Sequence, residues 1–218
     1  MEADFWHNRW ENNLTGFHLD EVNPHLKANW SSLNLKPAAR VFVPLCGKTL
    51  DLIWLADQGY QVVGIELSAL AAEAFFSENA IAVKRTEVAG MDLWQSETIS
   101  LFCGDFFDLT KDILGQVDAV YDRASLIALP PAMRQDYAAH LSKLAQSAPK
   151  LLVTLEYDQS KMAGPPFSVS ENEVKALYDT HYQVQQLSAQ DVLGDNTKFR
   201  EKGLEYMNEC LYQLTAKA

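Results

Sequence analysis

The sequence predicts a doubly wound α/β fold, in which a mostly parallel β-sheet is covered by helices on both faces to give three layers. Short apolar runs recur along the chain, and several are apolar almost throughout, which is typical of strands buried on both faces. Helical patterns separate most of these runs, and strands that alternate with helices form a parallel sheet. We expect one domain over residues 1–218, because the chain has single-domain length and shows no repeat or linker.

Each expected strand is a short apolar run that ends at a turn signal or a polar residue. Pro44 closes the first, since proline cannot continue a ladder of hydrogen bonds. The strands expected in the parallel part of the sheet are residues 40–44, 61–66, 99–103, 117–122 and 151–157. Two further runs, near residues 183–187 and 209–215, are expected to close the sheet.

The expected helices lie between these strands and carry start and stop signals. Gly59 ends the first helix, Ser68 caps the second, and Pro131 occupies the first turn of the third. Ser170 and Glu173 form a Ser-x-x-Glu capping box at the start of the fourth. The helices are therefore expected at residues 50–58, 69–79, 131–147 and 170–178.

Residues 1–35 form an aromatic-rich arm ahead of the first strand. Trp6, Trp10, Leu14 and Phe17 fall at helical spacing, although asparagine and glycine residues between them interrupt any long helix. Two interpretations stay open: the arm is an amphipathic segment packed on the sheet edge, or it is a lid that excludes water from a site.

Charge, cysteine and histidine content exclude several classes of function. The chain holds 18 Lys plus Arg and 29 Asp plus Glu, and its net charge of −11 repels a polyanion such as nucleic acid. The best basic cluster, Lys198, Arg200 and Lys202, is interrupted by Glu201. The three cysteines form no Cys-x-x-Cys motif, which argues against a disulfide framework or a zinc ribbon. The five histidines show no metal-ligand spacing, so we expect no metal.

Neither the N-terminal residues nor the apolar runs indicate secretion or insertion into a membrane. The sequence begins Met-Glu-Ala-Asp, without the basic and apolar regions of a secretory signal, and no run reaches the length of a membrane span. We therefore expect a cytoplasmic protein without a membrane partner.

Three stretches are expected at the carboxyl ends of strands, where doubly wound sheets bind their ligands. They are Pro44–Thr49, Glu66 and Asp122–Arg123. Glu66 lies 19 residues beyond Gly47, about the distance at which the acidic residue of a nucleotide-binding unit reaches the ribose hydroxyls. The alternative is an exposed acid at a strand end that caps the next helix together with Ser68.

The glycine content of the first turn indicates which nucleotide fits. A dinucleotide needs its pyrophosphate bound by backbone N–H groups, usually through Gly-x-Gly-x-x-Gly, but here Gly47 stands alone after bulky Leu45. This favours a ligand with adenosine and no phosphate, such as S-adenosylmethionine. Gly47-Lys48-Thr49 is similar to the end of a P-loop, but that motif needs a glycine where the chain has Phe42. Cys46 lacks a Cys/His/Asn pattern and is expected to be a buried small residue.

Several motifs in one order resemble the thiopurine S-methyltransferase family, including its bacterial members, over nearly the whole chain. They are Phe5-Trp-His-Asn-Arg-Trp10 with Gly16-Phe17-His18, Arg40-Val-Phe-Val-Pro-Leu-Cys-Gly-Lys48, Val62-Val-Gly-Ile-Glu-Leu-Ser68, Phe107-Asp-Leu109, Tyr121-Asp-Arg-Ala124 and Gly164-Pro-Pro-Phe167. The resemblance implies the fold of class I S-adenosylmethionine-dependent methyltransferases with an N-terminal aromatic lid. It also implies S-methylation of small aromatic or heterocyclic thiols, and detoxification of selenium or tellurium species.

The resemblance assigns roles to residues at matching positions. It implies that Phe17 and Arg123 also face the substrate, with a further basic residue near position 200, for which Lys198 and Arg200 both qualify. The residues that it implies for contact with the cofactor are Trp10, Leu45, Glu66 and Arg123, and those that complete the pocket are Trp6, Phe17, Asp105 and Phe106.

The expected reaction is an in-line attack of a thiolate on the methyl carbon of a sulfonium. Arg123 would be the catalytic residue, because its permanent charge stabilises the thiolate. The expected partner is a small-molecule thiol, and the protein is expected to act as a monomer. Two alternatives stay open: a nicotinamide-dependent oxidoreductase and a non-catalytic nucleotide-binding protein.

Overall fold

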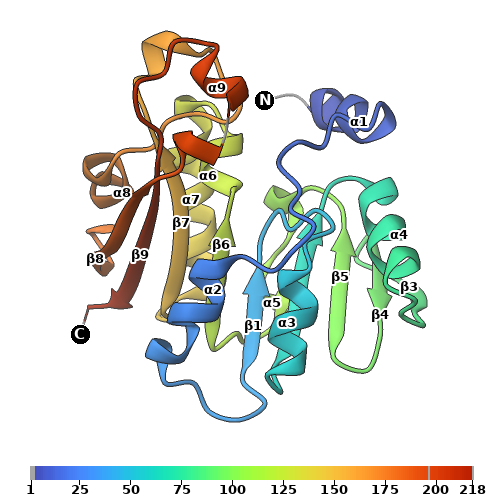
Figure 1. The fold of residues 1–218 in the computed structure, drawn as a ribbon. Coiled ribbons are helices and arrows are strands. Elements are labelled where there is room, and N and C mark those ends of the chain that lie inside the picture. Colours follow the sequence, from blue (N-terminus) through green and yellow to red (C-terminus); the bar gives the residue numbers. More distant parts are fainter. Residues whose placement is uncertain (1–2, 196, 218) are drawn as a thin grey trace. The chain divides into compact units, whose positions relative to one another are not determined.

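The computed structural model describes residues 3–195 and 197–217 and has the α/β architecture that the sequence predicts, with a mostly parallel central sheet (Figure 1). The chain forms two compact units, residues 1–121 and 122–218. Among the described residues, no helix is long and apolar enough to cross a membrane.

The sheet of the first unit has the strand order β3-β4-β5-β2-β1-β6. β1 (Arg40–Val43) pairs in parallel with β2 (Gln61–Glu66) and with β6 (Ala119–Arg123), which runs from the first unit into the second. β2 also pairs in parallel with β5 (Ile99–Cys103). The sheet therefore extends from β1 in two directions, and this change of direction is the topological switch point at which such folds bind ligands.

A hairpin at the edge of this sheet escaped the sequence prediction. β3 (Lys84–Val88) and β4 (Met91–Gln95) are antiparallel to each other, and β4 is antiparallel to β5. The turn between them, Ala89-Gly90, has positive φ at both residues, as a tight two-residue hairpin requires. Alanine replaces the usual asparagine or aspartate in this turn, and β3 is mostly polar, so neither carried a strand signal.

The helices of the first unit follow the expected signals. α3 (Asp51–Asp57) follows β1, and α4 (Ala69–Glu78) follows β2. The Ser68 hydroxyl accepts a hydrogen bond from the Ala71 N–H, which confirms the predicted cap. Two short helical segments, η2 (Phe106–Asp108) and α5 (Lys111–Leu114), lie between β5 and β6.

The arm consists of α1 (Ala3–Glu11), a loop, α2 (Pro24–Asn29) and a 3-10 turn, η1 (Trp30–Leu33). A buried carboxylate fixes the arm to the sheet: Asp51 accepts hydrogen bonds from the Asn23 N–H at 2.8 Å and from the Tyr121 hydroxyl at 3.0 Å. Asn23 in turn caps α2. The loop after α1 is therefore anchored at its far end.

The second unit is built on three antiparallel strands, β7 (Lys150–Glu156), β9 (Asn208–Ala216) and β8 (Tyr182–Asp191), with β9 paired to both others. The predicted strands near 183–187 and 209–215 are confirmed and are longer than expected. The helical segments of this unit are α6 (Ser125–Ala128), α7 (Pro131–Ala145), η3 (Gln159–Lys161), α8 (Glu171–Tyr178), η4 (Leu193–Asp195) and α9 (Thr197–Arg200).

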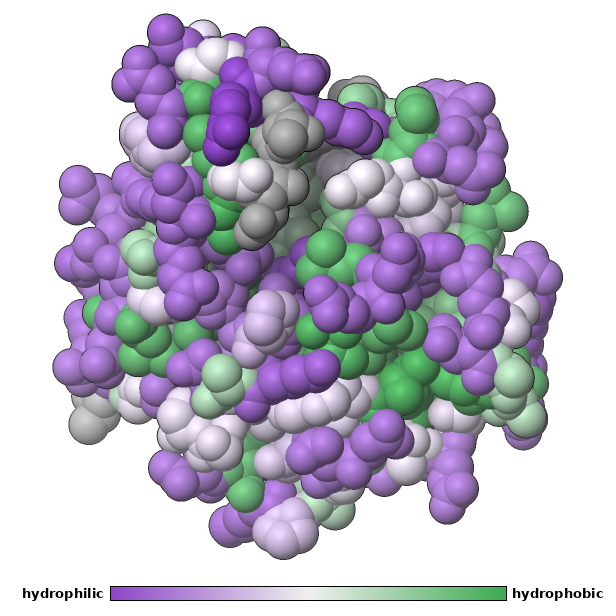
Figure 2. Space-filling view, viewed as in Figure 1, coloured by the Kyte–Doolittle hydropathy of each residue, from purple (hydrophilic) through white to green (hydrophobic). Residues whose placement is uncertain are grey.

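The face shown in Figure 2 is mostly hydrophilic, with apolar side chains in small groups. Among the described residues, the large hydrophobic side chains that are exposed are Leu14, Leu70, Phe107 and Tyr206. They are scattered along the sequence, which is ordinary for a globular surface.

Candidate cofactor and methyl-transfer site

The turn after β1 is held against β2 by backbone and packing contacts. The Cys46 N–H donates to the Ile65 carbonyl at 3.0 Å, and Leu45 and Gly47 on either side both have positive φ. A side chain at Gly64 would place its Cβ 2.8 Å from the Cys46 sulfur, so glycine is needed in β2 for this turn to pack. Cys46 is buried, and burial, followed by the nearby Glu66 charge, raises the pKa of its thiol well above the usual value. It is a packing residue, as the sequence predicts.

Glu66 ends β2 and is 6% exposed, and its carboxylate joins two segments of backbone. One oxygen accepts from the Gly47 N–H at 2.9 Å, and the other accepts from the Ser68 N–H at 2.8 Å. A carboxylate has about four acceptor positions, so these two bonds leave capacity for further donors. The alternative interpretation of Glu66 is correct in that the carboxylate bonds to Ser68, which caps the next helix, but it is wrong in that the acid is buried and not exposed.

The ionisation of Glu66 is set by opposing effects. Burial raises the pKa of its carboxyl group, and the N–H groups of Ser68, Gly47 and Leu67 act in the other direction. The charge of His7, in α1, also lowers this pKa. The influence of His7 on Glu66 has no signal in the sequence, because it depends on how α1 folds back.

The aromatic residues of the arm gather over the same turn. The Trp10 ring is 8% exposed and would lie 3.3 Å from a Cβ at Gly47. Phe17, which lies beyond the end of α1, packs edge-on against Trp6 and Trp10, with ring centroids 5.7 Å and 5.4 Å apart. In Figure 1, α1 lies beyond the carboxyl ends of the parallel strands of its unit.

The end of β5 supplies the remaining predicted residues of the first unit. The Gly104 N–H donates to the Glu66 carbonyl at 2.9 Å, which brings Asp105 close to the end of β2. Asp105 is exposed and caps η2 by accepting the Phe107 N–H at 2.9 Å. Phe106 is 2% exposed, so its ring belongs to the core of this edge. The first unit therefore brings together the predicted residues of the arm and of the ends of β1, β2 and β5.

Lys48 does not serve as a phosphate-binding lysine in this arrangement. Its ammonium group contacts both carboxylate oxygens of Glu78, in α4, at 2.7 Å. The side chain is directed to the helix surface and ties the turn to α4, which agrees with the rejection of the P-loop interpretation.

Arg123 ends β6 in the second unit and is half-buried. Its neighbour Asp122 is buried and accepts a hydrogen bond from the Tyr137 hydroxyl at 2.8 Å; burial raises the pKa of Asp122 to about 6. Within the described part of this unit, no ion pair joins Arg123 to Asp122. Lys198 and Arg200, the two candidates for a second basic residue, both lie exposed on α9.

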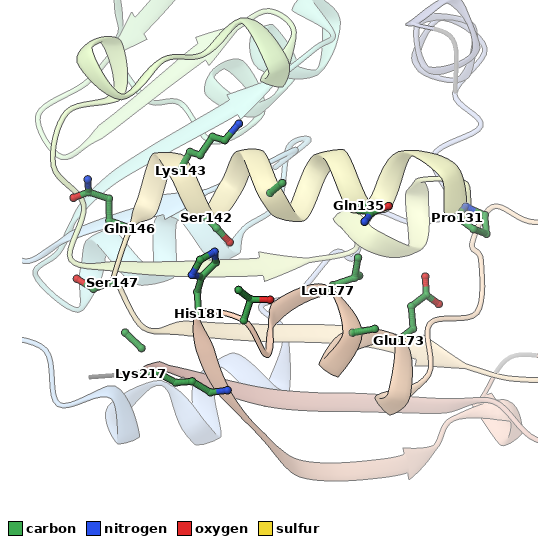
Figure 3. Close-up of a pocket in the computed structure, with 14 residues that line it drawn as sticks. Pro131, Gln135, Ser142, Lys143, Gln146, Ser147, Glu173, Leu177, His181 and Lys217 are labelled. Carbon is green, nitrogen blue, oxygen red and sulfur yellow. The ribbon is translucent and has the colours of Figure 1, made fainter.

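A groove of about 860 Å³ lies between α7, α8 and the end of β9 in the second unit (Figure 3). Its walls include Gln135, Ser142, Leu177 and His181. None of the predicted site residues lines it. Among the described residues, no cluster of His, Cys, Asp and Glu could hold a metal ion.

Two solved structures with this fold are methyltransferases. One is a 1,6-didemethyltoxoflavin-N1-methyltransferase from Burkholderia thailandensis, solved with S-adenosylhomocysteine; it has a TM-score of 0.65 and 16% identity, covering 99% of this chain and 87% of the other. Another is an S-adenosylmethionine-dependent methyltransferase from Anabaena variabilis, with a TM-score of 0.61 and 13% identity over 99% and 95% of the two chains. The fold is thus that of this class of methyltransferases.

The chain belongs to the thiopurine S-methyltransferase family, whose sequence profile matches residues 1–217. A thiopurine S-methyltransferase from Pseudomonas fluorescens is 48% identical over 214 residues, which cover 98% of this chain and 99% of the relative. One from Nitrosospira multiformis is 46% identical over 218 residues, covering 100% and 99%.

Proposed function

We propose that this chain transfers the methyl group of S-adenosylmethionine to the sulfur of a small aromatic or heterocyclic thiol, with thiopurines as substrates. The observation that carries the proposal is the Glu66 carboxylate, fixed by the Gly47 and Ser68 N–H groups next to the aromatic residues of the arm. Family membership over the full chain supports the same chemistry.

The residues present fit this cofactor. Glu66 has the acceptor capacity for the two ribose hydroxyls, and the faces of Trp10 and Phe17 suit a sulfonium cation. The turn at Gly47 lacks the glycines that a pyrophosphate needs, so it suits a nucleoside ligand better than a dinucleotide. We propose direct cofactor contacts for Trp10, Leu45, Glu66 and Arg123, with Trp6, Phe17, Asp105 and Phe106 completing the pocket.

S-adenosylmethionine, when bound, supplies a methyl carbon that is open to displacement. Arg123 provides a permanent positive charge for the acceptor sulfur. Because Arg123 is half-buried, its attraction for a thiolate is stronger than it would be in water. No general base is required, because an aromatic thiol ionises near neutral pH. The arm, acting as a lid, excludes water from the site, and Phe17 contacts the acceptor.

The whole chain acts as a single methyltransferase domain, residues 1–35 form its lid, and the protein works as a cytoplasmic monomer without a nucleic-acid partner. Lys198 or Arg200 supplies a second positive charge on the acceptor side. Selenium or tellurium species with thiol-like reactivity are further acceptors.

Incubation with methyl-labelled cofactor and a panel of thiols tests the proposal. We expect label to appear on thiopurines and thiophenols. A non-catalytic nucleotide-binding protein would bind the cofactor without transferring label, and a nicotinamide-dependent oxidoreductase would instead oxidise or reduce a nicotinamide in the presence of substrate. Either of those results would refute the proposed reaction.

A further inference from the structure

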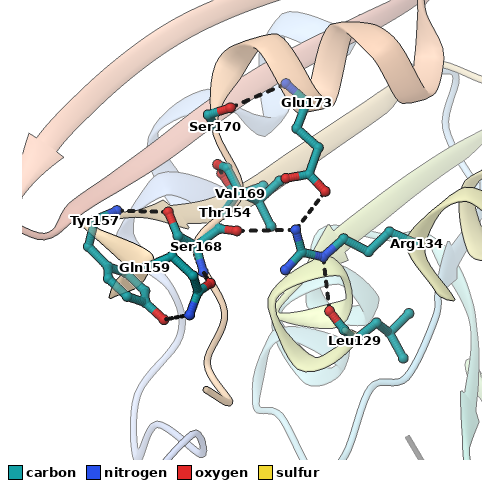
Figure 4. Close-up of polar contacts among 9 residues, drawn as sticks. All are labelled: Leu129, Arg134, Thr154, Tyr157, Gln159, Ser168, Val169, Ser170 and Glu173. Carbon is teal, nitrogen blue, oxygen red and sulfur yellow. Dashed lines mark hydrogen bonds and ion pairs between the residues drawn. The ribbon is translucent and has the colours of Figure 1, made fainter. Parts of the chain in front are cut away.

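A buried arginine joins three segments of the second unit that follow the carboxyl ends of strands (Figure 4). Arg134, in α7, is 1% exposed. Its Nε donates to the Leu129 carbonyl at 2.9 Å, just after α6, and its Nη1 donates to the Ser168 carbonyl at 3.1 Å. The same Nη1 lies 2.6 Å from a carboxylate oxygen of Glu173, in α8. Three groups with negative charge or partial charge thus converge on one guanidinium.

The loop that Arg134 fixes is Gly164–Ser168, which lies beyond the carboxyl end of β7. Its own contacts are specific. The Tyr157 hydroxyl donates to the Pro166 carbonyl at 2.6 Å, and the Phe167 N–H donates to the Ile127 carbonyl of α6 at 2.7 Å. Gly164 has a φ of +77°, and a Cβ there would lie 2.4 Å from the Phe167 ring, so only glycine allows this ring position.

The same contacts place the loop beside the segment that carries Arg123. α6 begins two residues after Arg123, and its C-terminal end is tied to the loop and to Arg134: the Ile127 carbonyl accepts from Phe167, and the Leu129 carbonyl, just after the helix, accepts from Arg134. The guanidinium of Arg134 lies 5.7 Å from the centre of the Phe167 ring. Phe167 itself is half-buried, so the fold does not enclose this residue completely.

We propose that Arg134 is a positioning residue for the methyl acceptor, which holds Phe167 and the Gly164–Ser168 loop in place as one wall of the acceptor subsite. The ligand that this wall takes is the flat ring of the thiol, because an aromatic face packs well on a fixed phenyl ring. The inference rests on the proposed function, since it assigns a subsite of that reaction. It goes beyond the cofactor contacts, because neither Arg134 nor any residue of the Gly164–Ser168 loop is among them.

The most informative variant is Glu173→Gln. It removes one charged partner of Arg134 and keeps the size of the side chain and the Glu173 backbone N–H that bonds to Ser170. Its matched control is Glu171→Gln, on the same helix, which removes an exposed ion pair with Lys175 whose length is also 2.6 Å. A second variant, Arg134→Lys, keeps the charge but cannot bond the Leu129 and Ser168 carbonyls and Glu173 from one planar group.

Steady-state kinetics and cofactor binding decide the question. In Glu173→Gln and Arg134→Lys we expect KM for a bicyclic thiopurine to rise on the order of tenfold, the effect of weakening charged hydrogen bonds. We expect a smaller rise for thiophenol and an unchanged Kd for S-adenosylhomocysteine, and no change in Glu171→Gln. If the folded variants keep the same ratio of the two KM values as the unaltered protein, this inference is overturned while the proposed function stands. Failure of the unaltered protein to methylate any thiol would overturn the proposed function, and this inference with it.

Discussion

The carboxylate of Glu66 accepts the backbone N–H of Gly47 at 2.9 Å, although the two residues lie 19 positions apart. This bond joins the end of β2 to the turn after β1 and holds the carboxylate beside the aromatic arm. The same carboxylate caps the next segment through Ser68. A single side chain therefore organises the turn and remains able to bind hydroxyl groups.

Replacement of Glu66 should weaken cofactor binding. We expect Glu66→Ala to cost about 1–3 kcal/mol of binding free energy for S-adenosylhomocysteine, as measured by calorimetry, because charge-assisted hydrogen bonds to the ribose are lost. Glu87→Ala, at an exposed position of β3, is the control and should bind normally. If folded Glu66→Ala binds with unchanged affinity, the carboxylate serves only the turn.

Removal of the arm should separate folding from turnover. Deletion of residues 1–20 leaves Asn23 and its anchor to Asp51, so we expect a protein that still unfolds cooperatively on heating. It should lose turnover, since Trp6, Trp10 and Phe17 are lost with the segment. Activity retained by the truncated protein would show that the arm only packs on the sheet.

Arg123 should act through its charge. We expect Arg123→Met to lower kcat/KM roughly a hundredfold, on the order of 2–3 kcal/mol, by removing a charged contact to the acceptor sulfur. The loss should be smallest for thiophenols of low pKa, which arrive already ionised. Arg85→Met, at a side chain that is 55% exposed, is the control. An equal loss for every thiophenol, together with a lower Tm, would assign Arg123 to the fold instead of to the reaction.

A buried lysine should make stability depend on pH. Lys150 is 1% exposed, its ammonium group contacts the Tyr182 hydroxyl, and burial lowers its pKa to about 7, partly opposed by the charge of Asp122. Above that value the unfolded chain still holds the proton that the folded chain has lost, so stability from this group rises with pH.

The pH-dependent gain in stability from Lys150 should be modest and should disappear when this side chain cannot titrate. Between about pH 7 and about pH 8.5 the gain should be at most about 2 kcal/mol. Tm measured across this range should rise more in the unaltered protein than in Lys150→Met, whereas Lys143→Met, at an exposed position, should follow the unaltered protein. Parallel curves for all three proteins would show that Lys150 keeps its proton in the folded state.

The features that the sequence predicts correctly are those with a local signal. Buried apolar runs mark β1, β2, β5 and β7, and the Ser68 and Ser170 caps mark the starts of two helices. Glu66 could be chosen because its position relative to Gly47 follows from one βαβ unit. The family resemblance, carried by distinct motifs, is confirmed along the whole chain.

The features that the sequence does not predict depend on tertiary contacts. The β3–β4 hairpin has a turn without the usual residues, and its outer strand is polar. The influence of His7 on Glu66 exists only because α1 folds back over the turn. Arg134 lies in a helix with an unremarkable sequence, and its role appears only when Leu129, Ser168 and Glu173 converge on it.

The position of the transferred methyl group tests the central claim most directly. With S-adenosylmethionine carrying carbon-13 in its methyl group and a thiopurine that offers both sulfur and ring nitrogens, the product can be read by carbon NMR. We predict one new resonance at the chemical shift of an S-methyl group, formed in step with S-adenosylhomocysteine. A resonance of an N-methyl group, or no labelled product at cofactor concentrations that saturate binding, would contradict the account.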